Sequence, residues 1–96
     1  MDTNYTRNVY VVIFDLSNKS KNYALLQNII KEYQFYAKLG EFSYLISTIQ
    51  TPVEVRTQLK HALESNDKLF IGKIIAPAAW TNMSAGVSEW IKNQLK

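Results

Sequence analysis

The sequence predicts an α+β fold, in which strand-forming and helix-forming segments alternate along one short chain. The stretch NVYVVIFDL, residues 8–16, holds six consecutive apolar or aromatic side chains followed by a carboxylate, Asp15. The segment TPVE, residues 51–54, is a capping box with proline at the first helical position, and it marks the start of a helix. Gly40 lies between two segments rich in aromatic and β-branched residues, which is typical of a hairpin.

The first predicted strand lies in the middle of the sheet. A run as short and as apolar as residues 8–16 suits a strand that is buried on both faces. Because side chains alternate along a strand, one face carries Val9, Val11, Ile13 and Asp15, and the other carries Tyr10, Val12, Phe14 and Leu16. We therefore expect Asp15 to emerge at the C-terminal end of a central strand.

A helix and a hairpin are predicted next. The polar loop SNKSKN offers Ser20 or Asn22 as the cap of a helix over about residues 22–33. Its apolar positions recur at helical spacing: Tyr23, Leu26, Ile30 and Tyr33. The segments QFYAKL and EFSYLISTI then form the hairpin, with its turn at Gly40.

The second half of the chain repeats this pattern and adds a tail. The capping box begins a helix over about residues 52–64, whose buried positions are Val55, Leu59, Ala62 and Leu63. After a turn at 65–67, KLFIGKII is the fourth strand, which Pro77 ends because proline cannot donate to the ladder. A last helix lies within residues 81–95, started by Thr81 or Ser84. Its apolar positions are Val87, Trp90, Ile91 and Leu95.

The predicted order is β-α-β-β-α-β with an added C-terminal helix, which is the ferredoxin-like arrangement of an antiparallel sheet. Right-handed crossovers place the first and fourth strands side by side and both helices on one face. The opposite face is then uncovered and exposes apolar side chains of the first strand. We therefore expect a homodimer through the open sheet face, helped by the C-terminal helix.

Length and composition limit the remaining possibilities. The 96 residues allow a single domain, residues 1–96, in which 1–7 is expected to be a flexible end. The absence of cysteine excludes disulfides and thiolate metal sites and favours a reducing, cytoplasmic setting. No apolar run approaches the roughly 18 residues of a membrane span, so no membrane partner is expected. The net charge of +3 is spread along the chain and permits an anionic partner without requiring one.

Several segments resemble one known group of proteins. They are YVVIFDL in the first strand, FSYLIST in the third, VRTQLKHALESNDKLFIGKI across the second helix and the fourth strand, and then AAW and SEWIKNQL. Over residues 9–95 the chain is similar to small ferredoxin-like proteins related to the CRISPR-associated protein 2 family, in the subgroup labelled SinR-family. SNDKL followed by AAW is the most specific part of the match. The toxin-like VapD proteins share the fold.

The resemblance implies a dimer and a candidate acidic site. In the better-studied relatives the fold dimerises through its sheet, and a strand-end aspartate in a Tyr-Asp-Leu motif lies near the two-fold axis. That aspartate has been assigned to Mg-dependent phosphodiester cleavage, and the matching residue here is Asp15. This chain departs from the motif at Phe14, where tyrosine is usual. It also offers only Lys19 and Lys21 where the relatives tend to have more arginine.

Asp15 is the strongest chemical candidate, with two readings left open. A Mg²⁺ ion takes oxygen ligands, and a two-fold axis would supply a pair of Asp15 carboxylates as metal ligands or catalytic groups. Alternatively, Asp15 caps the following loop by accepting hydrogen bonds from the amides of Ser17 or Asn18.

Other residues have weaker signals. Phosphate contacts could come from lysines: Lys19, Lys21, Lys38, Lys68 and Lys73. The aromatic residues near the hairpin could stack bases, although packing is the commoner role: Tyr33, Phe35, Tyr36, Phe42 and Tyr44. Trp80 and Trp90 are expected to anchor the last helix or a partner subunit. His61, the single histidine, is expected to be an exposed helix residue.

Three functions therefore stay open. The first is a scaffold or regulatory module associated with RNA or DNA. The second is a metal-dependent nuclease or endoribonuclease that uses Asp15 from both subunits, with Mg²⁺ as cofactor. The third is a small-ligand-binding regulatory domain, since a fold alone does not decide function.

Overall fold

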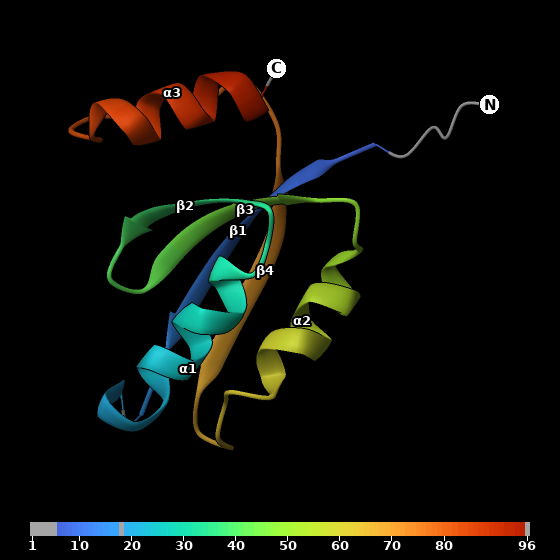
Figure 1. Cartoon of the computed structure of the whole chain (residues 1–96), viewed down its shortest axis with the longest axis vertical. Helices are drawn as coiled ribbons and strands as arrows, with labels where there is room; N and C mark the ends of the chain where they lie inside the picture. The colour runs from blue at the N-terminus through green and yellow to red at the C-terminus, as the bar shows by residue number, and fades with distance from the viewer. Residues whose placement is uncertain (1–5, 18, 96) are drawn as a thin grey trace.

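The computed structural model describes residues 6–17 and 19–95, and the side chains of residues 19–21 lie outside that description. In the described part of the chain, a four-stranded antiparallel sheet is combined with three helices, so the fold class is α+β (Figure 1). The strands are β1 (Asn8–Asp15), β2 (Phe35–Gly40), β3 (Ser43–Thr48) and β4 (Lys68–Ile74). The helices are α1 (Lys19–Lys31), α2 (Pro52–Lys60) and α3 (Ala85–Gln94).

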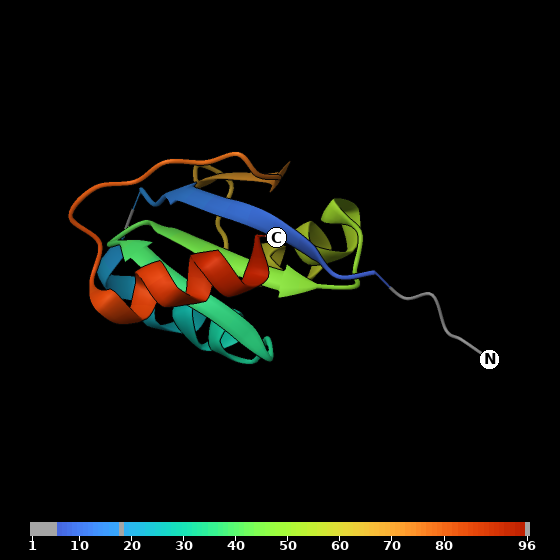
Figure 2. The same cartoon turned by 90° about the horizontal axis from the view of Figure 1, so that it is seen from above.

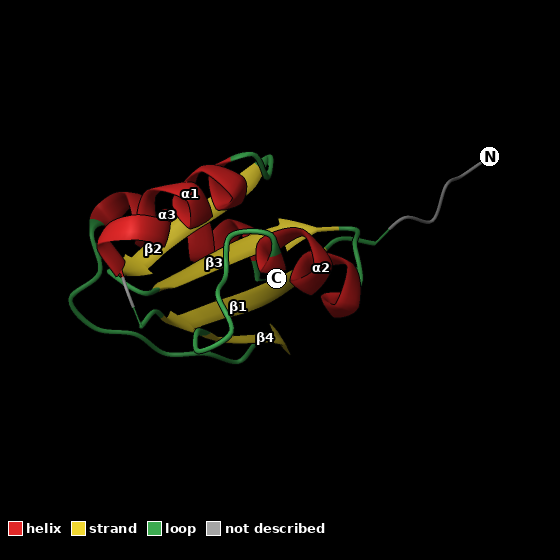
Figure 3. Ribbon diagram, turned by 90° about the horizontal axis from the view of Figure 1, so that it is seen from below, coloured by secondary structure: helices red, strands yellow, loops and turns green. Residues whose placement is uncertain are grey.

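The sheet has the strand order β2-β3-β1-β4, and every neighbouring pair is antiparallel (Figure 3). The predicted pairing of the first and fourth strands is confirmed, because β1 lies between β3 and β4. In the middle of β1, Val12 lies opposite Tyr44 of β3 and Ile71 of β4. Helices α1 and α2 each connect two strands that are separated by a third.

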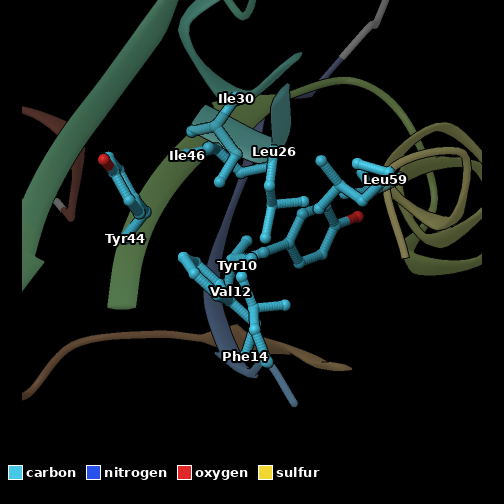
Figure 4. Packing of buried hydrophobic residues seen from close by; sticks show 11 residues of the cluster. Tyr10, Val12, Phe14, Leu26, Ile30, Tyr44, Ile46 and Leu59 are labelled. Atoms are coloured by element: carbon cyan, nitrogen blue, oxygen red, sulfur yellow. The ribbon is translucent and has the colours of Figure 1, made fainter. Parts of the chain in front are cut away.

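One face of the sheet packs under α1 and α2 and forms the larger core. Tyr10, Val12 and Phe14 project from β1 into this core. They meet fully buried side chains of both helices, among them Leu26, Ile30, Val55 and Leu59 (Figure 4). The predicted buried positions of the first two helices are confirmed at these residues. Burial of aliphatic and aromatic surface at about 25 cal/mol per Å² is what holds the helices to the sheet.

The start of α1 differs from the expected one, whereas α2 and α3 begin where capping residues were expected. Helix α1 already begins at Lys19, so neither Ser20 nor Asn22 precedes it as a cap. The capping box of α2 is confirmed by two reciprocal hydrogen bonds between Thr51 and Glu54, of 2.8 and 3.1 Å. Of the two expected starts of α3, Ser84 is the correct one, because its Oγ accepts a hydrogen bond from Val87. No helix in the described residues is long and apolar enough to cross a bilayer.

The second face of the sheet is covered in part, which corrects the expectation that it would be bare. Helix α3 lies on the side opposite α1 and α2 and runs across β2 and β3 (Figures 1 and 2). Ile91 of α3 is buried against Val9 of β1 and Leu45 of β3. Trp80 fixes this arrangement, since its indole N–H donates a 2.9 Å hydrogen bond to Ser88 of α3. Trp90 also packs against this second core, so the expected anchoring role of both tryptophans is confirmed.

The rest of the second face stays uncovered at the ends of β1 and β4 nearest Asp15 and Lys68. Ile13 and Phe70 are direct cross-strand neighbours there, with 46% and 60% of their surfaces exposed. The Phe70 ring lies along the sheet over Gly72, where a Cβ would come within 2.8 Å of the ring. We call Ile13, Phe70 and Gly72 the open patch. It is an apolar surface on the face that α3 covers only in part.

The docking of α3 can be tested by truncating its buried side chain. We expect Ile91→Ala to lower the free energy of unfolding by about 2–4 kcal/mol, because it removes transfer energy and leaves a cavity. Ile75→Ala is the matched control, since Ile75 is 70% exposed and should lose less than about 0.5 kcal/mol. Urea denaturation of both variants measures the difference. Equal losses would show that α3 is not packed on the sheet.

Candidate functional site

Asp15 is the last residue of β1 and lies at the edge of the open patch. Its side chain is exposed, on the same sheet face as Ile13, two residues earlier. Lys68, the first residue of β4, is its direct cross-strand partner. Within the side chains that the structure describes, the Asp15 carboxylate has no hydrogen bond and no ion pair. The carboxylate is therefore open to a ligand or a partner, with one lysine beside it.

The loop after β1 is held by a different carboxylate, that of Asp67. Its Oδ1 accepts hydrogen bonds from the backbone N–H (2.8 Å) and the hydroxyl (3.0 Å) of Ser17. Its Oδ2 accepts from the backbone N–H of Glu64 at 2.8 Å and from the side-chain amide of Asn22 at 3.4 Å. The expected cap of Ser17 by Asp15 is thus wrong. Asn18, the other expected donor, lies outside the described residues.

These hydrogen bonds perturb the titration of Asp67. The backbone N–H groups of Glu64 and Ser17 stabilise the charged carboxylate and lower its pKa below the ordinary value of 3.8. Asp67 therefore joins three parts of the chain, namely the end of β1, the first turn of α1 and the loop before β4. Its role is structural, and a turn-forming triplet Ser-Asn-Asp was its only signal in the sequence.

The described residues of one subunit do not gather a cluster of metal-ligating side chains. Among them, no group of three or more histidine, aspartate or glutamate side chains is placed to hold a metal ion. Mg²⁺ prefers octahedral oxygen coordination and usually takes one or two carboxylates, with waters and phosphate oxygens completing the shell. A single Asp15 could supply one such ligand, and another copy of the chain could supply a second carboxylate.

The lysines expected to contact phosphate do not form one cluster. Lys68 lies beside Asp15, whereas Lys73 lies toward the other end of β4, opposite Tyr10. Lys38 is on β2, at the opposite edge of the sheet, with its Nζ 6.0 Å from the centre of the Tyr23 ring. The side chains of Lys19 and Lys21 lie outside the described residues, although both residues belong to the first turn of α1.

The aromatic residues near the hairpin serve mainly in packing. Tyr44 is fully buried, and its ring stacks on Phe14 with the ring centres 6.2 Å apart. Phe42 meets Phe14 edge to face at 5.8 Å. Phe35 lies under the Arg7 guanidinium at 4.6 Å, and Arg7 also donates to the backbone oxygen of Ser47.

A second polar site, which the sequence did not indicate, lies at the other end of the sheet. The Tyr33 hydroxyl lies within hydrogen-bond distance of the side-chain oxygens of Gln50 and Gln58. These groups line an open cavity of about 500 Å³ together with His61, which is exposed at the C-terminus of α2 as expected. Burial, and then the charge of Glu54, raise the pKa of Tyr33 to about 12. The glutamines come from a loop and a helix, so no spacing in the sequence brings them together.

The two aspartates can be distinguished by the pH dependence of stability. A carboxylate with a lowered folded-state pKa stabilises the fold above its unfolded-state pKa, and that stability is lost as pH falls through the folded-state pKa. We expect Asp67→Asn to lower the melting temperature at pH 7, with the difference from wild type closing as pH falls below about 3.8. Asp15→Asn is the control and should change the melting temperature little. A larger loss in the control would mean that Asp15 is the structural acid.

Comparison of the chain with protein-family models, with curated proteins and with solved structures finds no match. Two features of the chain could hold a ligand or a partner. One is the open patch with Asp15 and Lys68 at its edge, and the other is the amide-lined cavity around Tyr33.

Proposed function

We propose that the chain is a ferredoxin-like protein of the CRISPR-associated protein 2-like type, and that it acts in the cytoplasm as a homodimeric scaffold or regulatory module on nucleic acid. The observation that carries this proposal is the open patch, with a free acid and a lysine at its edge. The ferredoxin-like assignment is supported by the order β2-β3-β1-β4, in which each crossover helix connects strands two positions apart. The segments that resemble this group of proteins support the dimer and the association with nucleic acid.

The occupant of the open patch is a second copy of the chain. Exposed Ile13 and Phe70 adjoin each other on one face of the sheet, and an exposed apolar surface is typical of an interaction site. A two-fold dimer requires a self-complementary surface. Asp15 and Lys68 provide that complementarity, because an axis through the patch can set the acid of one subunit against the lysine of the other.

Association with nucleic acid follows from charge and symmetry. The chain carries a net charge of +3, so the dimer would carry twice that charge. Lys68 faces Asp15 in this dimer, so the phosphate contacts fall to lysines outside the open patch, among them Lys19 and Lys21 in the first turn of α1 and Lys73 on β4. Lysine contacts with phosphates dominate the affinity of such surfaces and make it fall with rising salt.

A Mg-dependent nuclease is the second candidate, and one observation favours it. The loop after β1 is held by Asp67, which leaves the Asp15 carboxylate available at the predicted dimer axis. Two Asp15 carboxylates could then supply the protein ligands of one Mg²⁺ ion. Such an ion polarises a phosphate and lowers the pKa of a bound water, which is the chemistry that phosphodiester hydrolysis needs.

The dimer is tested by placing a charge in the open patch. We expect Phe70→Asp to raise the dimer dissociation constant at least about tenfold, because an unpaired carboxylate would be buried in the interface. Leu25→Asp is the matched control, since Leu25 is 49% exposed on α1, on the opposite face. Sedimentation equilibrium measures both variants. A wild-type chain that stays monomeric at high concentration contradicts the proposal.

The two candidate functions are separated by Asp15→Asn. Binding of single-stranded RNA or DNA at low salt should persist and strengthen slightly, because each subunit loses one negative charge. Any Mg-dependent cleavage should be lost. Glu89→Gln on α3 is the control, as an exposed acid outside the open patch. Cleavage that survives in Asp15→Asn contradicts the nuclease, and no binding of either nucleic acid at low salt contradicts the scaffold.

A further inference from the structure

The cavity around Tyr33 lies on the first face of the sheet, in the seam between α1 and α2. Its walls come from the end of α1 and the turn that follows it, the loop after β3 and the end of α2, and they include Ile29, Tyr33, Gln50, Gln58 and His61. Its volume of about 500 Å³ falls in the range of small-molecule sites. Thr48, which also lines it, pairs with Asn8 at the start of β1, so the cavity is at the end of the strand far from Asp15.

The hydroxyl of Tyr33 determines how the two glutamine side chains of this cavity are oriented. The Tyr33 hydroxyl lies 2.9 Å from the side-chain oxygen of Gln50 and equally within reach of that of Gln58. With its pKa raised to about 12, the hydroxyl keeps its proton near neutral pH. A hydroxyl with one proton can donate to only one of the two amides. The other amide satisfies the phenolic oxygen by turning its NH₂ group toward it.

The two amides therefore expose opposite groups. The amide that accepts from Tyr33 leaves its NH₂ free, and the amide that donates to Tyr33 leaves its carbonyl oxygen free. Because both glutamines line the cavity, it offers one free donor and one free acceptor to a ligand. The two glutamines can exchange these roles without moving the phenol.

This pair matches the hydrogen-bonding edge of a nucleobase. Each base carries donors and acceptors along its edge, and side-chain amides pair with such edges. Ile29 supplies an apolar wall for a flat ring. Two charged side chains also line the cavity, Glu32 and Arg7. The Glu32 carboxylate repels a phosphate, and the Arg7 guanidinium already donates to Ser47 and lies over the Phe35 ring, so the charges favour a neutral base over a phosphate.

We propose that this cavity binds the nucleobase of an unpaired nucleotide, with Tyr33 holding Gln50 and Gln58 so that one donates to the base and the other accepts from it. Single-stranded nucleic acids are typically recognised through bases that are free of the stack. The inference rests on the proposed association with nucleic acid and names the part of the ligand that this cavity takes. Because the two amides can exchange roles, the cavity accepts more than one kind of base.

The test compares strands with and without bases, using the full chain. Binding of a short single-stranded oligouridylate, of an abasic strand of equal length, and of free uridine is measured by calorimetry. We expect the wild type to bind oligouridylate more tightly than the abasic strand. Gln58→Ala removes one hydrogen bond from an exposed position and should weaken oligouridylate binding about fivefold without weakening abasic binding. Asn93→Ala, an exposed amide on α3, is the matched control and should change neither.

The outcomes separate this proposal from the proposed function. If strands bind but Gln58→Ala and wild type bind oligouridylate equally, the base cavity is wrong and the scaffold stands. If free uridine binds in a Gln58-dependent way and no strand binds, the cavity stands and the scaffold is wrong. If no probe binds the wild type, both are wrong. Circular dichroism of Gln58→Ala shows whether the variant keeps its fold.

Discussion

The structure depends on one constraint: β1 carries apolar side chains on both faces, and most of them have to be buried. On one side, Tyr10, Val12 and Phe14 are buried by α1 and α2. On the other, Val9 is buried by α3. Both neighbouring strands pair with β1, which makes it the centre of the sheet and the shared wall of two cores. The placement of α3 follows from this need, because the second core exists only where that helix lies.

The incomplete cover of the second face has a geometric reason. A helix is about 10 Å wide and neighbouring strands are about 4.8 Å apart, so one helix covers about two strands. The first face has two helices for four strands, and the second face has only α3, which crosses β2 and β3 (Figure 2). Ile13 on β1 and Phe70 on β4 lie beyond the part of the sheet that α3 covers, and both stay exposed. The open patch is therefore the part of the sheet that a second copy of the chain would have to cover.

Patterns among neighbouring residues predicted most of the helices and strands. The features that were not predicted depend on contacts between segments that are far apart in the sequence. The capping box at Thr51 and the alternation along β1 depend on neighbours in the sequence, so both could be read directly. Whether Asp15 or Asp67 accepts from Ser17 depends on how two segments 50 residues apart meet at one end of the sheet. The apolar stripe of α3 fitted either the chain's own sheet or a partner, and only the three-dimensional arrangement decides between them. The glutamines that meet Tyr33 come from separate elements and carry no spacing signal.

The two candidate sites lie at opposite ends of β1 and on opposite faces of the sheet. β1 has eight residues, which at about 3.3 Å each spans about 26 Å. A ligand the size of one nucleotide therefore cannot reach both Asp15 and Tyr33. A single strand held at the dimer axis could place one base in the cavity only if several further nucleotides passed around the edge of the sheet. Binding of a base and any chemistry at Asp15 would then be coupled through the strand rather than through the protein, and a free nucleoside would leave Asp15 unaffected.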